Sequence, residues 1–396
     1  MYFGNKSENS AKLSFVYVMI HLSVNHLASQ IFNNSSERFD ATAPFMVLVI
    51  KLSSFAWSCY DGSKSESDLS SSQKKNAVKE MPNLVEYFGF IFFFGGFLVG
   101  PMVHFKSYID FIEQKGDFEK LPSIRHRIIP TVKCLLSAVL TFLIALKLDQ
   151  IYDYPLMLNS DFLTSNNFVA KFKFMMICGL VARQKYYTAW KLSEGACNLA
   201  GIGFSGIDEN GKAQYKRVRN IEIFAIEFPQ NMKALTDSWN CLTALWLRND
   251  VYMRLTKKGQ KPGFLILVAT FATSAFWHGF WPGYYFFFLS ASLANISARW
   301  VRKNIRPFFL ENKALKGFYD IVGIFSTVVT INYIAAPFQL LTTDKSLAFY
   351  SAMNWFLHII IGTILVIDFF KLHTLIFKTP LKKKSDEAVV LKEKIN

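Results

Sequence analysis

The sequence predicts an all-α fold, a polytopic membrane helix bundle, from its composition and its apolar segments. Of its 396 residues, 52% are hydrophobic and 16% are aromatic, including 40 Phe. The mean hydropathy of +0.22 is too high for an ordinary soluble domain. Apolar stretches also recur at the length needed to cross about 30 Å of hydrocarbon. Together these observations predict an integral membrane protein.

Nine hydrophobic segments are candidate membrane spans. Several are short, or carry polar groups or paired glycines, for example Lys51, His26 and Gly95-Gly96. A membrane tolerates such segments where they are broken or re-entrant inside protein. We therefore expect helices arranged around an internal catalytic chamber. The segments are Leu13–Phe32, Ala43–Tyr60, Leu84–Val103, Val132–Leu148, Phe168–Trp190, Phe264–Trp277, Tyr284–Ile296, Phe318–Leu341 and Ala348–Phe370.

The net charge and the cysteine pattern of the chain indicate which kinds of binding partner to expect. The net charge is +15, from 44 Lys and Arg against 29 Asp and Glu. In a soluble protein this excess would suggest a nucleic-acid partner, whereas in a membrane protein it is typical of loops that face anionic lipid. We expect membrane lipids and no nucleic acid. The five cysteines form no CxxC pair, which predicts neither a disulfide framework nor a metal site.

We expect a single domain over residues 1–396, with a membrane-embedded core at about 13–370 and a charged cytosolic tail at 371–396. The N-terminus is polar and shows no cleavable signal peptide, so the spans themselves should direct insertion. Lys392 and Lys394 lie five and three positions from the C-terminus, which resembles a dilysine retrieval signal. This resemblance predicts a multi-pass protein of the endoplasmic reticulum membrane.

His278 is the candidate general base. It lies within "SAFWHGFWPGYYFFF", where an imidazole without hydrogen-bond partners is costly. Histidines in apolar segments, such as His26 and His358, ordinarily hydrogen-bond to a neighbouring helix. Gly279 and the Pro-Gly pair that follows should instead break the helix beside His278 and leave backbone to line a cavity. The near-neutral pKa of histidine suits it to accept a proton at pH 7.

Asn240 is the second candidate. Apolar residues recur at intervals of three and four between Met232 and Trp246, which predicts one amphipathic helix. Asn240 would lie about 100° round that helix from Trp239, on a flank shared with Thr236. It can present its amide to a polar cavity there, or it can cap or solvate the helix. Periodicity alone favours the second interpretation.

The stretch "GIGFSG", Gly201 to Gly206, fits the G-x-G-x-x-G pattern of dinucleotide-binding folds. Neither a strand before it nor a helix after it is predicted, and a polar loop follows. We therefore interpret these glycines as a bend.

Four stretches together resemble one family. They are "SWNCLTALWLRNDVYMRL", "SAFWHGFWPGYY", "RQKYYTAWKLSEGACNLAGIGFSG" and "KLSSFAWSCYDG". They are similar to motifs of the membrane-bound O-acyltransferase family, in its lysophospholipid acyltransferase branch, and the likeness runs from about Leu13 to about Phe370. Members carry several more hydrophobic spans before the position of Leu13, so we expect a shortened chain.

The resemblance implies transfer of a fatty acyl group from acyl-CoA to the free hydroxyl of a lysophospholipid, in phospholipid synthesis and remodelling. It implies no cofactor besides acyl-CoA as co-substrate. His278 would take the hydroxyl proton, and Asn240 would either orient the hydroxyl or donate a hydrogen bond to the carbonyl oxygen. The implied substrate-binding residues are Trp239, Trp277, Tyr284, Tyr252 and Glu194, although the first three can equally be plain core.

Two alternatives remain open at this point. One is an O-acyltransferase for another acceptor, such as a sterol, diacylglycerol or a peptide. The other is an inactive relative that acts as a transporter or scramblase. Transport coupled to ions would favour carboxylates inside the spans, and most Asp and Glu lie in loops or at span ends, with Glu86 and Asp368 as the nearest exceptions.

Overall fold

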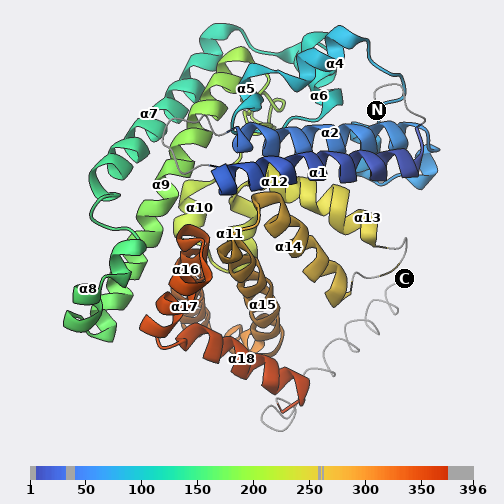
Figure 1. Ribbon diagram of the computed structural model, residues 1–396. Helices are drawn as coiled ribbons and strands as arrows, with labels where there is room; N and C mark the ends of the chain where they lie inside the picture. Colours follow the sequence, from blue (N-terminus) through green and yellow to red (C-terminus); the bar gives the residue numbers. More distant parts are fainter. Residues whose placement is uncertain (1–5, 33–40, 257–259, 261–262, 373–396) are drawn as a thin grey trace.

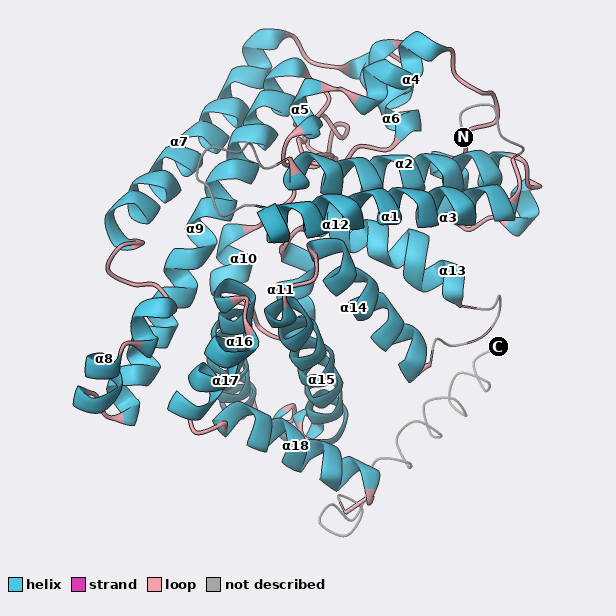
Figure 2. Ribbon diagram, viewed as in Figure 1, coloured by secondary structure: helices cyan, strands magenta, loops and turns pink. Residues whose placement is uncertain are grey.

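The computed structural model describes residues 6–32, 41–256, 260 and 263–372, and helices build this part of the chain (Figures 1 and 2). The sole extended pairing within it is an isolated β-bridge between Ile207 and Ala213. The predicted all-α fold is therefore confirmed. Residues 373–396, most of the expected tail with its two terminal lysines, lie outside the described residues.

The first two long helices lie side by side (Figure 1). They are α1 (Glu8–Phe32) and α2 (Thr42–Gly62), and both are long and apolar enough to cross a membrane. One face of α1 carries exposed apolar side chains such as Leu13 and Ile20, as expected for a surface in contact with lipid. The short helix α3 (Ser71–Asn76) follows α2.

The segment expected to span the membrane at Leu84–Val103 is instead broken. It forms α4 (Leu84–Ile91) and α5 (Phe94–Phe97) and then continues without helix. Lys51 of α2 is buried beside the break, and its ammonium donates to the carbonyls of Phe90 and Ile91 at 3.0 Å each. Because these carbonyls are at the end of α4, the lysine satisfies acceptors that the helix leaves open.

Helices α7 (Ile124–Leu148) and α9 (Phe168–Ala200) run alongside each other (Figure 1). Gly201 ends α9 in the left-handed conformation, with φ of 109°, and the "GIGFSG" stretch is a bend, as predicted. The short helix α8 (Ser160–Ser165) lies between them in the chain, whereas α6 (Phe105–Ile112) packs against α3 and α4.

Short elements fill the middle of the chain. They are α10 (Ile223–Glu227), α11 (Met232–Ser238), α12 (Cys241–Trp246), the π-helical segment η4 (Leu247–Tyr252) and α13 (Met253–Leu255). A π-helical turn is uncommon and often marks a functional region.

The C-terminal helices pack around α15 (Pro282–Asn304) (Figure 2). Beside it lie α14 (Phe264–His278) and α16 (Lys313–Leu340). The expected span at Ala348–Phe370 is divided between α17 (Thr343–Ala352) and α18 (Phe356–Phe369), which meet at 84°.

Fewer elements are uniform membrane spans than the nine predicted. Within the described residues, the helices long and apolar enough are α1, α2, α7 and α16, and the bent pair of α17 and α18 can count as a fifth. The apolar helix α14 has 15 residues. Helices α9 and α15 are long but carry buried polar groups, including Arg183 and Ser297. The expected mixture of spanning, broken and inward-facing helices is therefore present.

Candidate active site

A cavity of about 880 Å³ lies inside the bundle. Helices from both ends of the chain contribute to its wall, namely α1, α2, α9, α10, α11, α12, η4, α14, α15 and α16. Most of the lining side chains are apolar or aromatic, and a small number of polar groups interrupt them. This is the usual form of a binding site for a small molecule.

His278 is the last residue of α14 and lines the cavity. Gly279 follows with φ of 122°, and Pro282 begins α15, so the predicted break is confirmed. The Phe288 ring stacks on the imidazole at 5.3 Å and the Phe338 ring meets it edge-on at 5.0 Å between centroids. Among the residues that the structure describes, none hydrogen-bonds to the His278 ring nitrogens. The imidazole is thus available to a ligand in the cavity.

The segment that carries His278 is held from two sides. From α1, Nε2 of His26 donates to the carbonyl of Trp277 at 3.0 Å. At the other end, the amide of Gly283 donates to the carbonyl of Leu341 at 2.7 Å. A β-carbon on Gly283 would lie 2.0 Å from a backbone oxygen of α16, so only glycine fits this contact. Both anchors restrict where the imidazole can lie.

The expectation of one continuous helix around Asn240 is wrong. Helix α11 ends at Ser238 and α12 begins at Cys241, and Asn240 lies between them with φ of 46° and ψ of 49°. Asparagine adopts this left-handed conformation more readily than most residues. The apolar spacing of Met232–Trp246 continues across the break, which is why periodicity does not reveal it. Asn240 nevertheless lines the cavity.

Five of the seven predicted site residues meet at the cavity. They are His278, Asn240, Trp239, Trp277 and Tyr284. Trp239 contacts an aromatic group on α9, with its centroid 5.3 Å from that of Trp190. The indole of Trp277 donates to the carbonyl of Met46 at 2.9 Å, which ties α14 to α2.

The other two predicted residues, Glu194 and Tyr252, are not among the residues that line the cavity. Glu194 is buried on α9, where it pairs with Lys191 at 2.7 Å. Tyr252 ends the π-helical segment, and its carbonyl accepts from Thr256 at 2.7 Å. Both lie in motifs that resemble the family, but a motif does not specify which of its side chains face the chamber. The lining residues of α9 include Tyr186 and others on its inner face.

A buried ion pair supports the cavity wall and was not predicted. The Arg183 guanidinium donates to both carboxylate oxygens of Glu227, at 2.9 and 2.6 Å, and to Oδ1 of Asn332 at 2.6 Å. Tyr187 also donates to Glu227, at 2.6 Å. These contacts join α9, α10 and α16. A bidentate pair with further hydrogen bonds is the arrangement in which a buried ion pair is tolerated.

Groups that can hold an anion are few at the cavity. Among the described lining residues, the basic side chains are Arg183, which is bound to Glu227, and Lys185, which is exposed. Across the described part of the chain, no group of three His, Cys, Asp or Glu side chains is placed to hold a metal ion.

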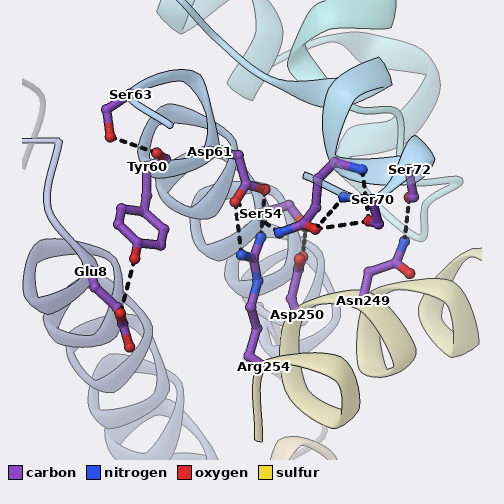
Figure 3. A network of polar contacts seen from close by, with 11 residues as sticks. Glu8, Ser54, Tyr60, Asp61, Ser63, Ser70, Ser72, Asn249, Asp250 and Arg254 are labelled. Carbon is purple, nitrogen blue, oxygen red and sulfur yellow. Dashed lines mark hydrogen bonds and ion pairs between the residues drawn. The ribbon is translucent and has the colours of Figure 1, made fainter. Parts of the chain in front are cut away.

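A second polar network joins the "WSCYDG" stretch of α2 to η4 and α13 (Figure 3). Arg254 donates to both carboxylate oxygens of Asp61, at 2.8 and 2.6 Å. Its guanidinium also lies 4.4 Å from the Trp57 ring centroid. Asp250 accepts a short hydrogen bond from Ser54. Two buried carboxylates therefore share one guanidinium.

Burial raises the pKa of Asp250 to about 6, although the Ser54 hydroxyl and the charge of Arg254 favour the carboxylate. The charge of Asp61 adds to the rise. The network thus carries an unbalanced negative charge above this pH. Sequence motifs did identify the α2 stretch, but its partners in α13 and η4 lie 193 and 196 positions away.

The fold and the cavity define a membrane protein whose helices enclose a chamber with a histidine and an asparagine in its wall. The sequence model of the membrane-bound O-acyltransferase family matches residues 27–336. The chain belongs to this family.

Curated relatives are similar over most of the chain. The lysophospholipid acyltransferase of Schizosaccharomyces pombe is 34% identical over 394 residues, covering 97% of this chain and 75% of that protein. The lysophospholipid acyltransferase of Saccharomyces cerevisiae is 36% identical over 382 residues, covering 90% of this chain and 62% of that protein. Human membrane-bound glycerophospholipid O-acyltransferase 2 is 35% identical over 367 residues, covering 89% and 69%.

Proposed function

We propose that this chain is a lysophospholipid acyltransferase of the endoplasmic reticulum membrane that uses acyl-CoA as donor. The observation that carries the proposal is that His278 and Asn240 both line one largely apolar cavity. The family membership and the names of the similar lysophospholipid acyltransferases support the acyl-transfer chemistry and the lysophospholipid acceptor.

In the proposed reaction, the acceptor hydroxyl attacks the thioester carbonyl of acyl-CoA. His278 takes the hydroxyl proton as the new C–O bond forms, because an alcohol is a weak nucleophile until its proton is removed. The C–S bond then breaks, and the leaving CoA thiolate takes this proton from the imidazole to become the thiol. The products are a phospholipid and CoA, with no acyl-enzyme intermediate. The aromatic walls at Trp239 and Tyr284 suit an acyl chain.

The phosphate groups of both substrates need a basic partner. Lys185 is exposed at the cavity wall, so we assign it to these phosphates, whereas Arg183 is already bound to Glu227. Residues 13–370 would act as a single domain around the chamber, because its wall draws on α1 at one end and α16 at the other.

The test is acyl transfer from labelled oleoyl-CoA to lysophosphatidylcholine in microsomes. His278→Ala should reduce the rate at least tenfold with unchanged protein level, since general-base catalysis contributes about 10²–10⁴-fold. His126→Ala, a matched change at an exposed histidine of α7, should leave the rate unchanged. A His278→Ala protein that keeps more than about a tenth of the rate would contradict the general-base role.

Parallel reactions with other acceptors define the substrate class. Lysophospholipids with different headgroups, a sterol, diacylglycerol and a hydroxyl-bearing peptide are offered at equal concentration. Transfer confined to a sterol or a peptide would contradict the proposed acceptor while leaving the acyl-transfer chemistry intact.

A further inference from the structure

We propose that Asn220 is a positioning residue: it fixes the orientation of the Asn240 amide so that Nδ2 of Asn240 is the atom offered to the substrate. The inference rests on the proposed function, because it assigns a role within that reaction. Asn220 is buried, with 3% of its surface exposed, and it precedes α10 in the chain. No sequence motif identified it.

The orientation of Asn220 follows from a backbone contact. Its Oδ1 lies 3.1 Å from the amide nitrogen of Leu242. A backbone N–H can only donate, so the side-chain atom that faces it must be the oxygen. The amide nitrogen of Asn220 is therefore the atom that faces Asn240. The backbone carbonyl of Asn220 also accepts from Cys241 at 2.9 Å, which fixes the residue from a second direction.

The orientation of Asn240 follows in turn. Nδ2 of Asn220 donates to Oδ1 of Asn240 at 3.0 Å. An NH₂ group has no acceptor, so Asn240 must present its oxygen to Asn220. Within the described part of the chain, Nδ2 of Asn240 has no hydrogen-bond partner. Asn240 lines the cavity. Its Nδ2 can therefore donate a hydrogen bond to a ligand bound there.

The surrounding backbone keeps this arrangement in place. The amide of Glu222 donates to the carbonyl of Ser238 at 3.1 Å, so the loop after Asn220 runs along the break between α11 and α12. Three hydrogen bonds from residues 220–222 thus hold the left-handed residue Asn240 on both sides. A donor fixed in advance loses little energy to reorganisation when charge develops beside it.

The two roles left open for Asn240 now differ in their support. Oδ1 of Asn240 already accepts from Asn220, whereas the NH₂ group has no partner within the described part of the chain and carries two donor hydrogens. The geometry points to Asn240 as a hydrogen-bond donor to the charge that develops on the thioester carbonyl oxygen. Asn220 also lines the cavity, but its Oδ1 and Nδ2 are bound to Leu242 and Asn240, so we assign its effect on the reaction to the Asn240 amide.

Asn220→Asp tests the inference. The carboxylate can still accept from Leu242 but cannot donate to Oδ1 of Asn240, so the Asn240 amide should turn its NH₂ towards residue 220. Removal of one such donor typically lowers kcat about 10²–10³-fold. We expect a fall in kcat of about 100-fold with KM changed less than about threefold. Asn210→Asp, in an exposed loop, is the matched control and should leave both constants unchanged.

A double-mutant comparison separates positioning from a general effect of the new charge. In an Asn240→Ala background the amide is absent, so Asn220→Asp should lower kcat by less than about threefold further. The result expected is a loss of at least tenfold in the parent and less than threefold in the Asn240→Ala protein. Any other combination overturns the proposal. The parent's own rate reports separately on the proposed function.

All rates are compared per amount of monodisperse detergent-extracted protein. If Asn220→Asp is not monodisperse, Asn220→Ser and Asn220→Ala replace it, because the serine hydroxyl can donate to Oδ1 of Asn240 and alanine cannot. A kcat for Asn220→Ser at least about tenfold above that of Asn220→Ala supports the proposal. A smaller difference overturns it.

Discussion

Asp250→Asn is expected to stabilise the protein above pH 6, which is an unusual outcome for a change inside a buried polar network. In the network of Figure 3, Arg254 already binds Asp61 through two hydrogen bonds. Asp250 is therefore a second carboxylate without a cation of its own. Asparagine keeps an oxygen to accept from Ser54 and removes the unbalanced charge.

The magnitude follows from the pKa of Asp250, which burial raises from 3.8 to about 6. Between these two pH values the folded state holds a proton that the unfolded state has released. The free energy of unfolding therefore falls as the pH rises from about 4 to 6, and the loss persists above pH 6. A rise of this size corresponds to about 3 kcal/mol. We expect Asp250→Asn to recover about 1 to 3 kcal/mol at pH 8, and less at pH 4.5.

Thermal unfolding in detergent at pH 4.5, 6 and 8 measures this effect. The melting temperature of Asp250→Asn should exceed that of the parent by a few degrees at pH 8, and the difference should shrink as the pH falls. Asp61→Asn is the matched control, because it removes the carboxylate that Arg254 does bind, and it should lower the melting temperature. Equal shifts at all three pH values, or shifts of the same sign in both variants, would refute the reasoning.

Two further predictions concern the segment that carries His278. His26→Ala removes the donor to the Trp277 carbonyl and should lower kcat about tenfold, because the His278 imidazole is less well placed. His26→Gln keeps an N–H donor and should restore most of kcat. A loss confined to KM would contradict this role. Gly283→Ala places a β-carbon 2.0 Å from the Pro337 carbonyl oxygen and should lower the free energy of unfolding by about 2 kcal/mol or more. Gly317 has open space around its β-position, so Gly317→Ala should change the free energy of unfolding by less than about 1 kcal/mol. Similar melting temperatures for the two alanine variants would count against that contact.

Local chemistry made the break after His278 predictable. A Gly and a Pro-Gly pair beside a buried imidazole leave few alternatives for the backbone, and α14 ends where expected. The aromatic walls at Trp239, Trp277 and Tyr284 were predictable for a related reason, because they adjoin the two polar candidates in the sequence.

The break at Asn240 was not predictable from its own neighbourhood. The apolar spacing is the same whether the helix continues or ends. The residue that hydrogen-bonds to Asn240 at the break is Asn220, 20 positions upstream. The same holds for the span expected at 84–103, where the lysine that binds the end of α4 belongs to α2. Contacts of this kind depend on tertiary packing, which a single sequence pattern does not encode.

Lys51 also bears on how the chain enters the bilayer during synthesis. A lysine near the middle of an isolated transmembrane helix disfavours insertion by about 3 kcal/mol. The carbonyls that satisfy this lysine belong to residues 39 and 40 positions further along the chain, so they are synthesised after α2. We therefore expect α2 to be more stable in the bilayer once α4 is in place beside it.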